Sequence, residues 1–263
     1  MNAPEYLEHI RAESARFAGC LAGADPSAPV PSCPDWTAAD LVWHLAEVQL
    51  FWGAIVRERL DDPDLAEAAK PERPDDYEAL LGLFAKASAA LVDTLAATAD
   101  DVSVWTWADD HTVGFIRRRQ AHEALIHRVD AELVAGQLTH VDRSLASDGV
   151  DEALRVMFGE HPAWGTLTTD GPTGSIETTD TDAAWALRLG RFSGTSPNTG
   201  KTYDEETLIV LAEPERPPSF TLRGDASDLD LWLWGRAGAD PLQMVGDAGA
   251  FARLETIVKA GLD

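Results

Sequence analysis

The spacing of apolar residues changes once along this chain, and that change limits the possible folds more than any other feature. Up to about residue 140, apolar residues recur at helical spacing, which predicts helices over residues 5–23, 41–60, 77–99 and 117–136. Thr37, followed three residues later by Asp40, resembles a capping box ahead of the second helix. Four amphipathic helices predict a four-helix bundle, and the long loop at residues 61–76 allows a crossover between the second and third helices.

Beyond this point the pattern is typical of strands. Short alternating runs bounded by Gly, Pro and Asp predict strands over residues 164–171, 174–180, 183–192, 206–213 and 219–225. Helical patterns at residues 149–159, 226–236 and 248–262 accompany them. A chain of 263 residues is long enough for two domains that each bury a core. We therefore expect an α+β protein, with a helical bundle domain over residues 1–140 and a smaller α+β domain over residues 141–263.

Composition argues against several classes of partner. The formal net charge is -24, from 21 Lys and Arg against 45 Asp and Glu, so most of the surface would repel a nucleic acid backbone. The N-terminus lacks a basic start followed by an apolar run, and no stretch approaches the roughly 18 apolar residues of a membrane span. We expect a cytoplasmic protein that binds neither nucleic acid nor membrane. Cys20 and Cys33 form no CxxC pair, so neither a disulfide scaffold nor a cysteine metal site is expected.

The fourth predicted helix carries an unusual set of histidines and acids. At 100° per residue, Glu123 and His127 lie about 40° apart, and Asp130 lies about 20° on the other side of Glu123, so the three share one stripe. His122 lies about 140° from His127, so "HEALIH" lacks the two histidines four residues apart of the HExxH zinc helix. We expect His122 to contact the other domain or solvent and not to be a ligand.

The second helix places another histidine on a buried stripe. His44 shares this stripe with Leu41, Val48, Phe51 and Ile55, which predicts an imidazole inside the bundle. Metal sites in four-helix bundles are built from carboxylates and histidines that project inward from facing helices. From the residues alone, two interpretations stay open. His44 is either a satisfied core histidine or a ligand, and the pair on the fourth helix is either a solvent-facing ion pair or half of a metal site.

The chain resembles a known family in three segments. Residues 30–52, "VPSCPDWTAADLVWHLAEVQLFW", and residues 117–132, "RRRQAHEALIHRVDAE", are similar to the N-terminal domain of the mycothiol-dependent maleylpyruvate isomerase family, a branch of the DinB-like metal-binding bundles. Residues 220–236, "FTLRGDASDLDLWLWGR", resemble its small C-terminal domain. The resemblance implies that His44, Glu123 and His127 bind zinc with at least one position open. Two histidines and one carboxylate also suit iron(II), which the residue types do not exclude.

The resemblance also implies a reaction. A metal-bound thiol is deprotonated, so zinc would make mycothiol a reactive thiolate without any protein cysteine. In the family this thiolate adds to the conjugated double bond of maleylpyruvate, the bond rotates, and the thiol leaves. If the thiol stays attached, the same site is a mycothiol S-transferase of detoxification or biosynthesis. A non-catalytic metal- or ligand-binding protein and an iron-dependent oxygenase are the other hypotheses for the same ligands.

Further residues have both a functional and a structural interpretation. Asp130 either hydrogen-bonds a ligand or the thiol cofactor, or forms a salt bridge with Arg128 or a neighbouring helix. Arg236 either reaches across to the metal to bind a dicarboxylate substrate, or caps the end of its tryptophan-rich helix.

The remaining charged residues of the fourth helix are expected on its outer surface. One of the three consecutive arginines, Arg117, Arg118 and Arg119, would face the site in the functional interpretation, whereas such runs more often lie on a solvated turn. We expect the helix to bury only its inner stripe and to turn its arginines and remaining acids outward. Nothing in the sequence indicates an oligomeric state.

Overall fold

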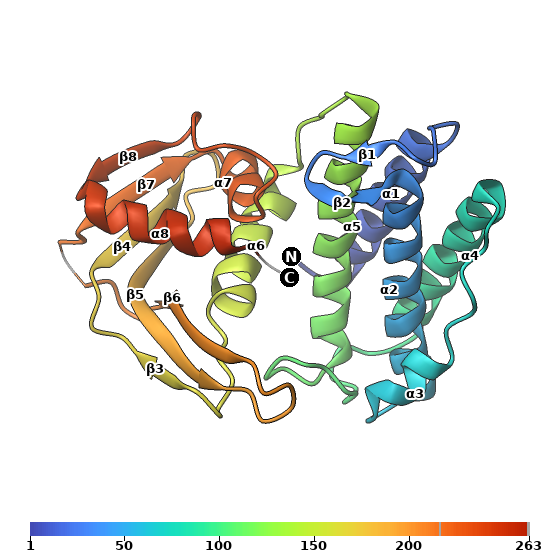
Figure 1. Cartoon of the computed structure of the whole chain (residues 1–263), viewed down its shortest axis with the longest axis horizontal. Helices are drawn as coiled ribbons and strands as arrows, with labels where there is room; N and C mark the ends of the chain where they lie inside the picture. Colours follow the sequence, from blue (N-terminus) through green and yellow to red (C-terminus); the bar gives the residue numbers. More distant parts are fainter. Residues whose placement is uncertain (216, 262–263) are drawn as a thin grey trace. The chain divides into compact units, whose positions relative to one another are not determined.

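The computed structural model describes residues 1–215 and 217–261, and the chain divides into two compact units, Met1–Thr139 and His140–Asp263 (Figure 1). We call them the helical unit and the sheet unit. The first consists mainly of long helices, and the second contains a six-stranded sheet. This arrangement confirms the predicted α+β class.

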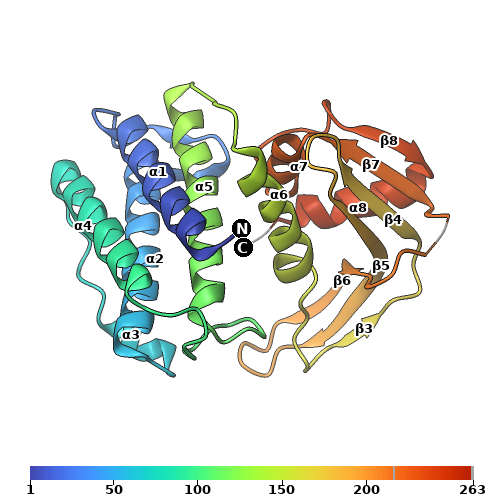
Figure 2. The same ribbon diagram turned by 180° about the vertical axis from the view of Figure 1, so that it is seen from behind.

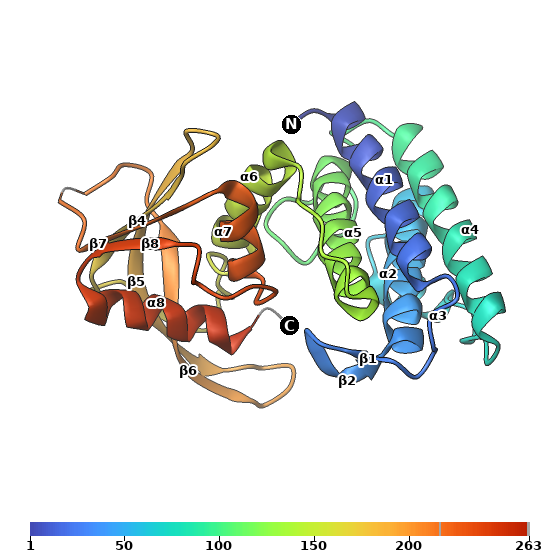
Figure 3. The same ribbon diagram turned by 90° about the horizontal axis from the view of Figure 1, so that it is seen from above.

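The helical unit is built from four long helices, α1 (Ala3–Leu21), α2 (Ala38–Glu58), α4 (Tyr77–Ala96) and α5 (Val113–Ala135). Within this unit, α1 and α2 each pack against both α4 and α5 (Figures 1 and 3). Buried apolar residues of these helices, including Phe17, Leu41, Leu45 and Phe84, form one core cluster. A long connection runs from the short helix α3 (Pro63–Ala68) to the start of α4 (Figure 2).

Two segments predicted as irregular contain regular structure. The proline-rich link before α2 forms the antiparallel strands β1 (Pro29–Val30) and β2 (Cys33–Thr37), and the loop after α2 contains α3. The predicted capping box is confirmed, because Thr37 Oγ1 accepts a hydrogen bond from the Asp40 amide and the Asp40 carboxylate accepts one from the Thr37 amide. The cap fixes the end of β2 against the first turn of α2. His44 lies farther along the same helix.

Helix α5 is more buried than the sequence predicts. It begins at Val113 after the N-cap Thr112 and ends at Ala135. The C-cap Gly136 follows, and its φ of 66° lies in the left-handed region that glycine adopts readily. The expectation that its arginines and remaining acids face outward is wrong for all but the half-buried Arg118, since the following are buried: Arg117, Arg119, Arg128 and Glu132. Burial is possible because α5 packs against both α1 and α2 and because these charges are paired inside the unit.

The buried arginines of α5 have distinct partners. Arg128 forms ion pairs with Glu13 on α1 and with Glu132 one turn along its own helix. Arg117 donates to the backbone carbonyls of Leu95 and Thr98 at the end of α4, a helix with no basic residue in its last turn. Its guanidinium thus caps α4, which is a structural role.

Helix α4 is long and apolar enough to cross a membrane by length and composition alone. Core helices of other proteins pass the same test. Here Leu80, Phe84, Leu91 and Leu95 are buried in the helical unit, so packing accounts for the apolar face of the helix.

The sheet unit begins with α6 (Arg143–Glu152), which runs on into one π-helical turn at Ala153–Met157. Its sheet has the order β3-β5-β4-β7-β8, with β6 also paired to β5, and only β4 and β7 are parallel. The strands are β3 (Thr166–Thr168), β4 (Thr173–Thr178), β5 (Ala184–Thr195), β6 (Thr202–Val210), β7 (Phe220–Gly224) and β8 (Gln243–Gly246). Helix α7 (Ala226–Leu233) follows β7, and α8 (Ala248–Ala260) packs against β6, β7 and β8.

The sequence prediction for this unit missed one strand. β8 is only four residues long and mostly exposed, so it lacks the apolar alternation by which the other strands were predicted. The predicted end of the last helix at residue 262 lies outside the described residues.

Candidate metal centre

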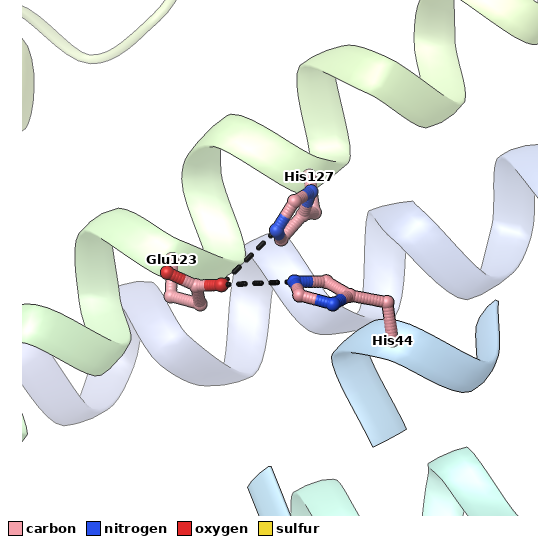
Figure 4. A group of neighbouring side chains, drawn as sticks. All are labelled: His44, Glu123 and His127. Atoms are coloured by element: carbon pink, nitrogen blue, oxygen red, sulfur yellow. Dashed lines mark hydrogen bonds and ion pairs between the residues drawn. The ribbon is translucent and has the colours of Figure 1, made fainter. Parts of the chain in front are cut away.

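Three side chains from two helices converge in the helical unit. His44 comes from α2, and Glu123 and His127 lie one turn apart on α5 (Figure 4). Glu123 Oε1 is 3.0 Å from His127 Nε2 and 3.4 Å from His44 Nε2. The structure thus brings together the three residues on which the metal site was predicted, although His44 and Glu123 are 79 positions apart in the sequence.

The spacing of these atoms fits a small metal ion. Tetrahedral ligands at the usual zinc distances of 2.0–2.1 Å are about 3.3 Å from one another. The two contacts of Glu123 Oε1 are close to that value, and one ligand atom from each residue lies within 4.8 Å of the others. Across residues 1–215 and 217–261, no fourth His, Cys, Asp or Glu joins this group. Three protein ligands with room for another are the pattern of catalytic zinc sites.

The Glu123 carboxylate accepts a hydrogen bond from an arginine through its second oxygen. Arg119 Nη2 donates to Glu123 Oε2 over 2.7 Å, and the Arg119 side chain is only 4% exposed. Burial by itself raises the pKa of the Glu123 carboxyl, but the charge of Arg119 and hydrogen bonds from His127 and His44 hold that pKa well below its ordinary value. Glu123 is therefore ionised, the state in which a carboxylate can bind a metal.

The His127 imidazole on α5 is oriented by a second carboxylate. Asp130 is fully buried, and its Oδ2 lies 2.9 Å from His127 Nδ1. Burial alone lowers the pKa of His127, but hydrogen bonds with Asp130 and Glu123 raise it to about 9. The contact assigns the Nδ1 proton to the side of Asp130, which leaves Nε2 facing Glu123 and His44. The structure thus shows the hydrogen bond to a candidate ligand that was one of the two interpretations of Asp130.

Two residues near the site were not singled out by the sequence analysis. Ser32, in the turn between β1 and β2, donates to Asp130 Oδ1 over 2.5 Å. The ring of Trp36 lies 4.6 Å from the His44 ring and 6.2 Å from the His127 ring, centroid to centroid. The segment "SCPDWT" ahead of the capped helix contains both residues, but only the hairpin fold shows that it lies against the site.

The remaining residues considered in the sequence analysis are His122, the arginines at the start of α5, and Arg236. His122 is fully buried, so the expectation of solvent contact is wrong, and it is outside the three-residue group. Among the three consecutive arginines, Arg119 faces the site and Arg117 caps α4. Arg236, in the sheet unit, donates to the carbonyl of Trp234 over 2.7 Å, the contact of a helix-end cap.

Comparisons with known proteins agree with this arrangement. The family model described as the mycothiol maleylpyruvate isomerase N-terminal domain matches residues 7–132, and the one described as the MDMPI C-terminal domain matches residues 144–253. No curated protein matches the chain.

Two solved structures are similar to this chain. They are crystal structures of the mycothiol-dependent maleylpyruvate isomerase and of a variant of it in which one histidine is replaced by alanine. Each is 13% identical to this chain and aligns over 94% of it and 95% of the other chain, with TM-scores of 0.53 and 0.56 respectively. At this identity the similarity shows a shared fold. Since the two domain models together span most of the sequence, the chain belongs to the mycothiol-dependent maleylpyruvate isomerase family.

Proposed function

We propose that this chain is a zinc-dependent enzyme that activates the thiol of mycothiol for addition to an electrophilic substrate, in a reaction of the maleylpyruvate cis-trans isomerase type. The observation that carries the proposal is the convergence of His44, Glu123 and His127 with no fourth protein ligand among the described residues. These residues would hold the zinc ion through two Nε2 atoms and Oε1. When bound, zinc supplies a cationic centre that lowers the pKa of a thiol that coordinates it.

The protein itself offers no suitable thiol at this site. Neither Cys20 nor Cys33 is in a disulfide, and neither belongs to the three-residue group. Burial and the nearby charge of Glu132 raise the pKa of the Cys20 thiol, which keeps it protonated near neutral pH. The nucleophile is therefore a thiol from outside the chain, consistent with the mycothiol dependence of the family.

The residues around the ligands have supporting roles. Asp130 holds the Nδ1 proton of His127, so Nε2 is the nitrogen that would bind the metal once its own proton is displaced. The Trp36 ring packs against the His44 ring and lies beside His127, so it forms part of the apolar surroundings of both imidazoles. We further propose that Arg236 binds a carboxylate of the substrate, because its guanidinium is suited to paired contacts with a carboxylate and this acidic chain needs local positive charge to hold a dicarboxylate.

Turnover with defined reactants tests the proposal. The zinc-loaded protein is mixed with maleylpyruvate, with and without mycothiol, and the products are separated and weighed by mass spectrometry. The proposal predicts a trans isomer of unchanged mass, formed only when thiol is present. A stable adduct of substrate and thiol would instead identify an S-transferase. No thiol-dependent conversion of maleylpyruvate or of a generic electrophile, despite bound zinc, would favour a non-catalytic binding protein.

A further inference from the structure

Glu123 uses its two carboxylate oxygens differently. Oε1 faces both imidazole Nε2 atoms, at 3.0 and 3.4 Å, whereas Oε2 accepts the hydrogen bond from Arg119. The arginine lies one turn before Glu123 on the same helix, so the backbone of α5 fixes the separation of the two residues. One oxygen is thus directed at the candidate metal position and the other is directed away from it.

We propose that Arg119 is a positioning residue that restricts Glu123 to binding the metal through a single oxygen. This inference rests on the metal site of the proposed function and goes beyond it by assigning the residue that determines how many metal positions stay open. A carboxylate free to turn can bind through both oxygens and fill a position that an external thiol needs. With Oε2 engaged by a guanidinium, that position stays available.

The pair is difficult to break, as this role requires. Arg119 is 4% exposed and the Glu123 side chain is 18% exposed, so solvent competes little for their charges. Removing one partner of a buried pair leaves the other charge without compensation, which is strongly unfavourable. The planar guanidinium also fixes the direction of the carboxylate better than a lysine ammonium could.

Arg119 also tunes the charge of the site. Its positive charge next to Glu123 makes the carboxylate a weaker donor, whereas Asp130 behind His127 makes the imidazole a stronger one. The two ligands of α5 are thus held by groups of opposite sign. A purely structural ion pair would stabilise α5 in the same way but would leave the coordination of the metal unchanged.

Cobalt(II) substitution distinguishes these possibilities, because its visible absorption is strong in four-coordinate sites and weak at higher coordination. Spectra are recorded for the wild type, Arg119→Gln, Arg119→Lys and the control Arg16→Gln, which removes the ion pair of a half-exposed arginine with Glu132 away from the site. Arg119→Gln is expected to show weaker cobalt bands and about 10- to 100-fold lower thiol-dependent activity. Arg119→Lys should restore much of the spectrum, and Arg16→Gln should match the wild type.

Other results would distinguish failure of the role of Arg119 from failure of the metal site itself. Equal spectra for the wild type and Arg119→Gln would overturn the role of Arg119 while leaving the metal site intact. A wild type that binds no cobalt or zinc would refute the metal site itself. If Arg119→Gln does not fold, a crystal structure of the zinc-loaded wild type decides the question. We expect one Glu123 oxygen at about 2.0–2.2 Å from zinc with the other still on Arg119, and two bound oxygens would contradict the proposal.

Discussion

Replacing Asp130 by asparagine tests how the site controls His127. Asp130 is fully buried and accepts hydrogen bonds from His127 Nδ1 at 2.9 Å and from Ser32 Oγ at 2.5 Å. The substitution keeps the shape of the side chain but removes its charge and turns an NH₂ group toward one of the two donors. Loss of a partner behind a ligating histidine costs about 10- to 100-fold in metal affinity, which corresponds to about 1.4–2.7 kcal/mol.

Proton competition changes this effect with pH. The pKa of His127 is about 9 in the metal-free protein, so near pH 7 only about one molecule in a hundred has an imidazole ready to bind metal. Removing the Asp130 charge lowers that pKa and relieves the competition, which offsets part of the lost donor strength. The affinity deficit of Asp130→Asn should therefore be largest above pH 9 and should shrink toward pH 7.

Zinc affinities from competition with a chromophoric chelator at pH 7 and pH 9.5 provide the assay. The matched control is Asp101→Asn, which removes a carboxylate from an exposed loop position of the same unit. Equal affinities of Asp130→Asn and the wild type at pH 9.5 would refute the role assigned to Asp130. A deficit that grows from pH 9.5 to pH 7 would refute the assigned coupling between the carboxylate and the His127 proton.

Three further expectations concern the protonation of His127, the N-cap of α2 and the core of the helical unit. In the wild type, zinc affinity should rise about tenfold per pH unit up to about pH 9, because binding must displace the His127 proton, and a flat titration would contradict this. Thr37→Ala should lower the free energy of unfolding by about 1 kcal/mol. Hydrogen bonds from Thr37 and the contact with Arg73 lower the pKa of Asp40 to about 2, so the stability they add is complete above the unfolded value of 3.8 and is lost as pH falls through 2. Acid unfolding monitored by circular dichroism should show a smaller loss for the variant. Phe84→Ala should destabilise the helical unit by about 3–5 kcal/mol in chemical denaturation without changing zinc stoichiometry, since this core residue is outside the metal group.

Helical periodicity predicted that Glu123 and His127 share one face of their helix, but not that they form one site with His44. Glu123 and His127 are separated by four positions, so any α-helix places them on one face, and the structure shows them 3.0 Å apart. The apolar neighbours of His44 predicted a fully buried stripe, which is only partly correct: Leu41 and Ile55 are buried, whereas the His44 side chain is 28% exposed. Its grouping with Glu123 and His127 came from the family resemblance. Helix periodicity alone does not specify which buried stripes face each other.

Helical periodicity did not predict contacts that depend on how separate segments pack together. Ser32 and Trp36 reach the site because a proline-rich segment folds into a two-stranded hairpin, and the sequence gives no alternation by which those short strands are identified. The arginines of α5 were expected in solvent on the basis of charge. Arg128 is buried because it meets Glu13 of α1, whose position depends on the fold of the unit, whereas Arg119 is buried together with Glu123 of its own helix where α5 packs against its neighbours.

Metal content and turnover measured together on His44→Ala test the central claim most directly. His44 is the single candidate ligand on α2, and its side chain is 28% exposed, so its truncation should leave the packing of the helical unit nearly intact. Elemental analysis is expected to find one zinc ion per wild-type chain, with thiol-dependent turnover, and to find both zinc and turnover lost in folded His44→Ala. Retention of either zinc or thiol-dependent turnover in the variant, or iron in place of zinc in the wild type, would contradict the account.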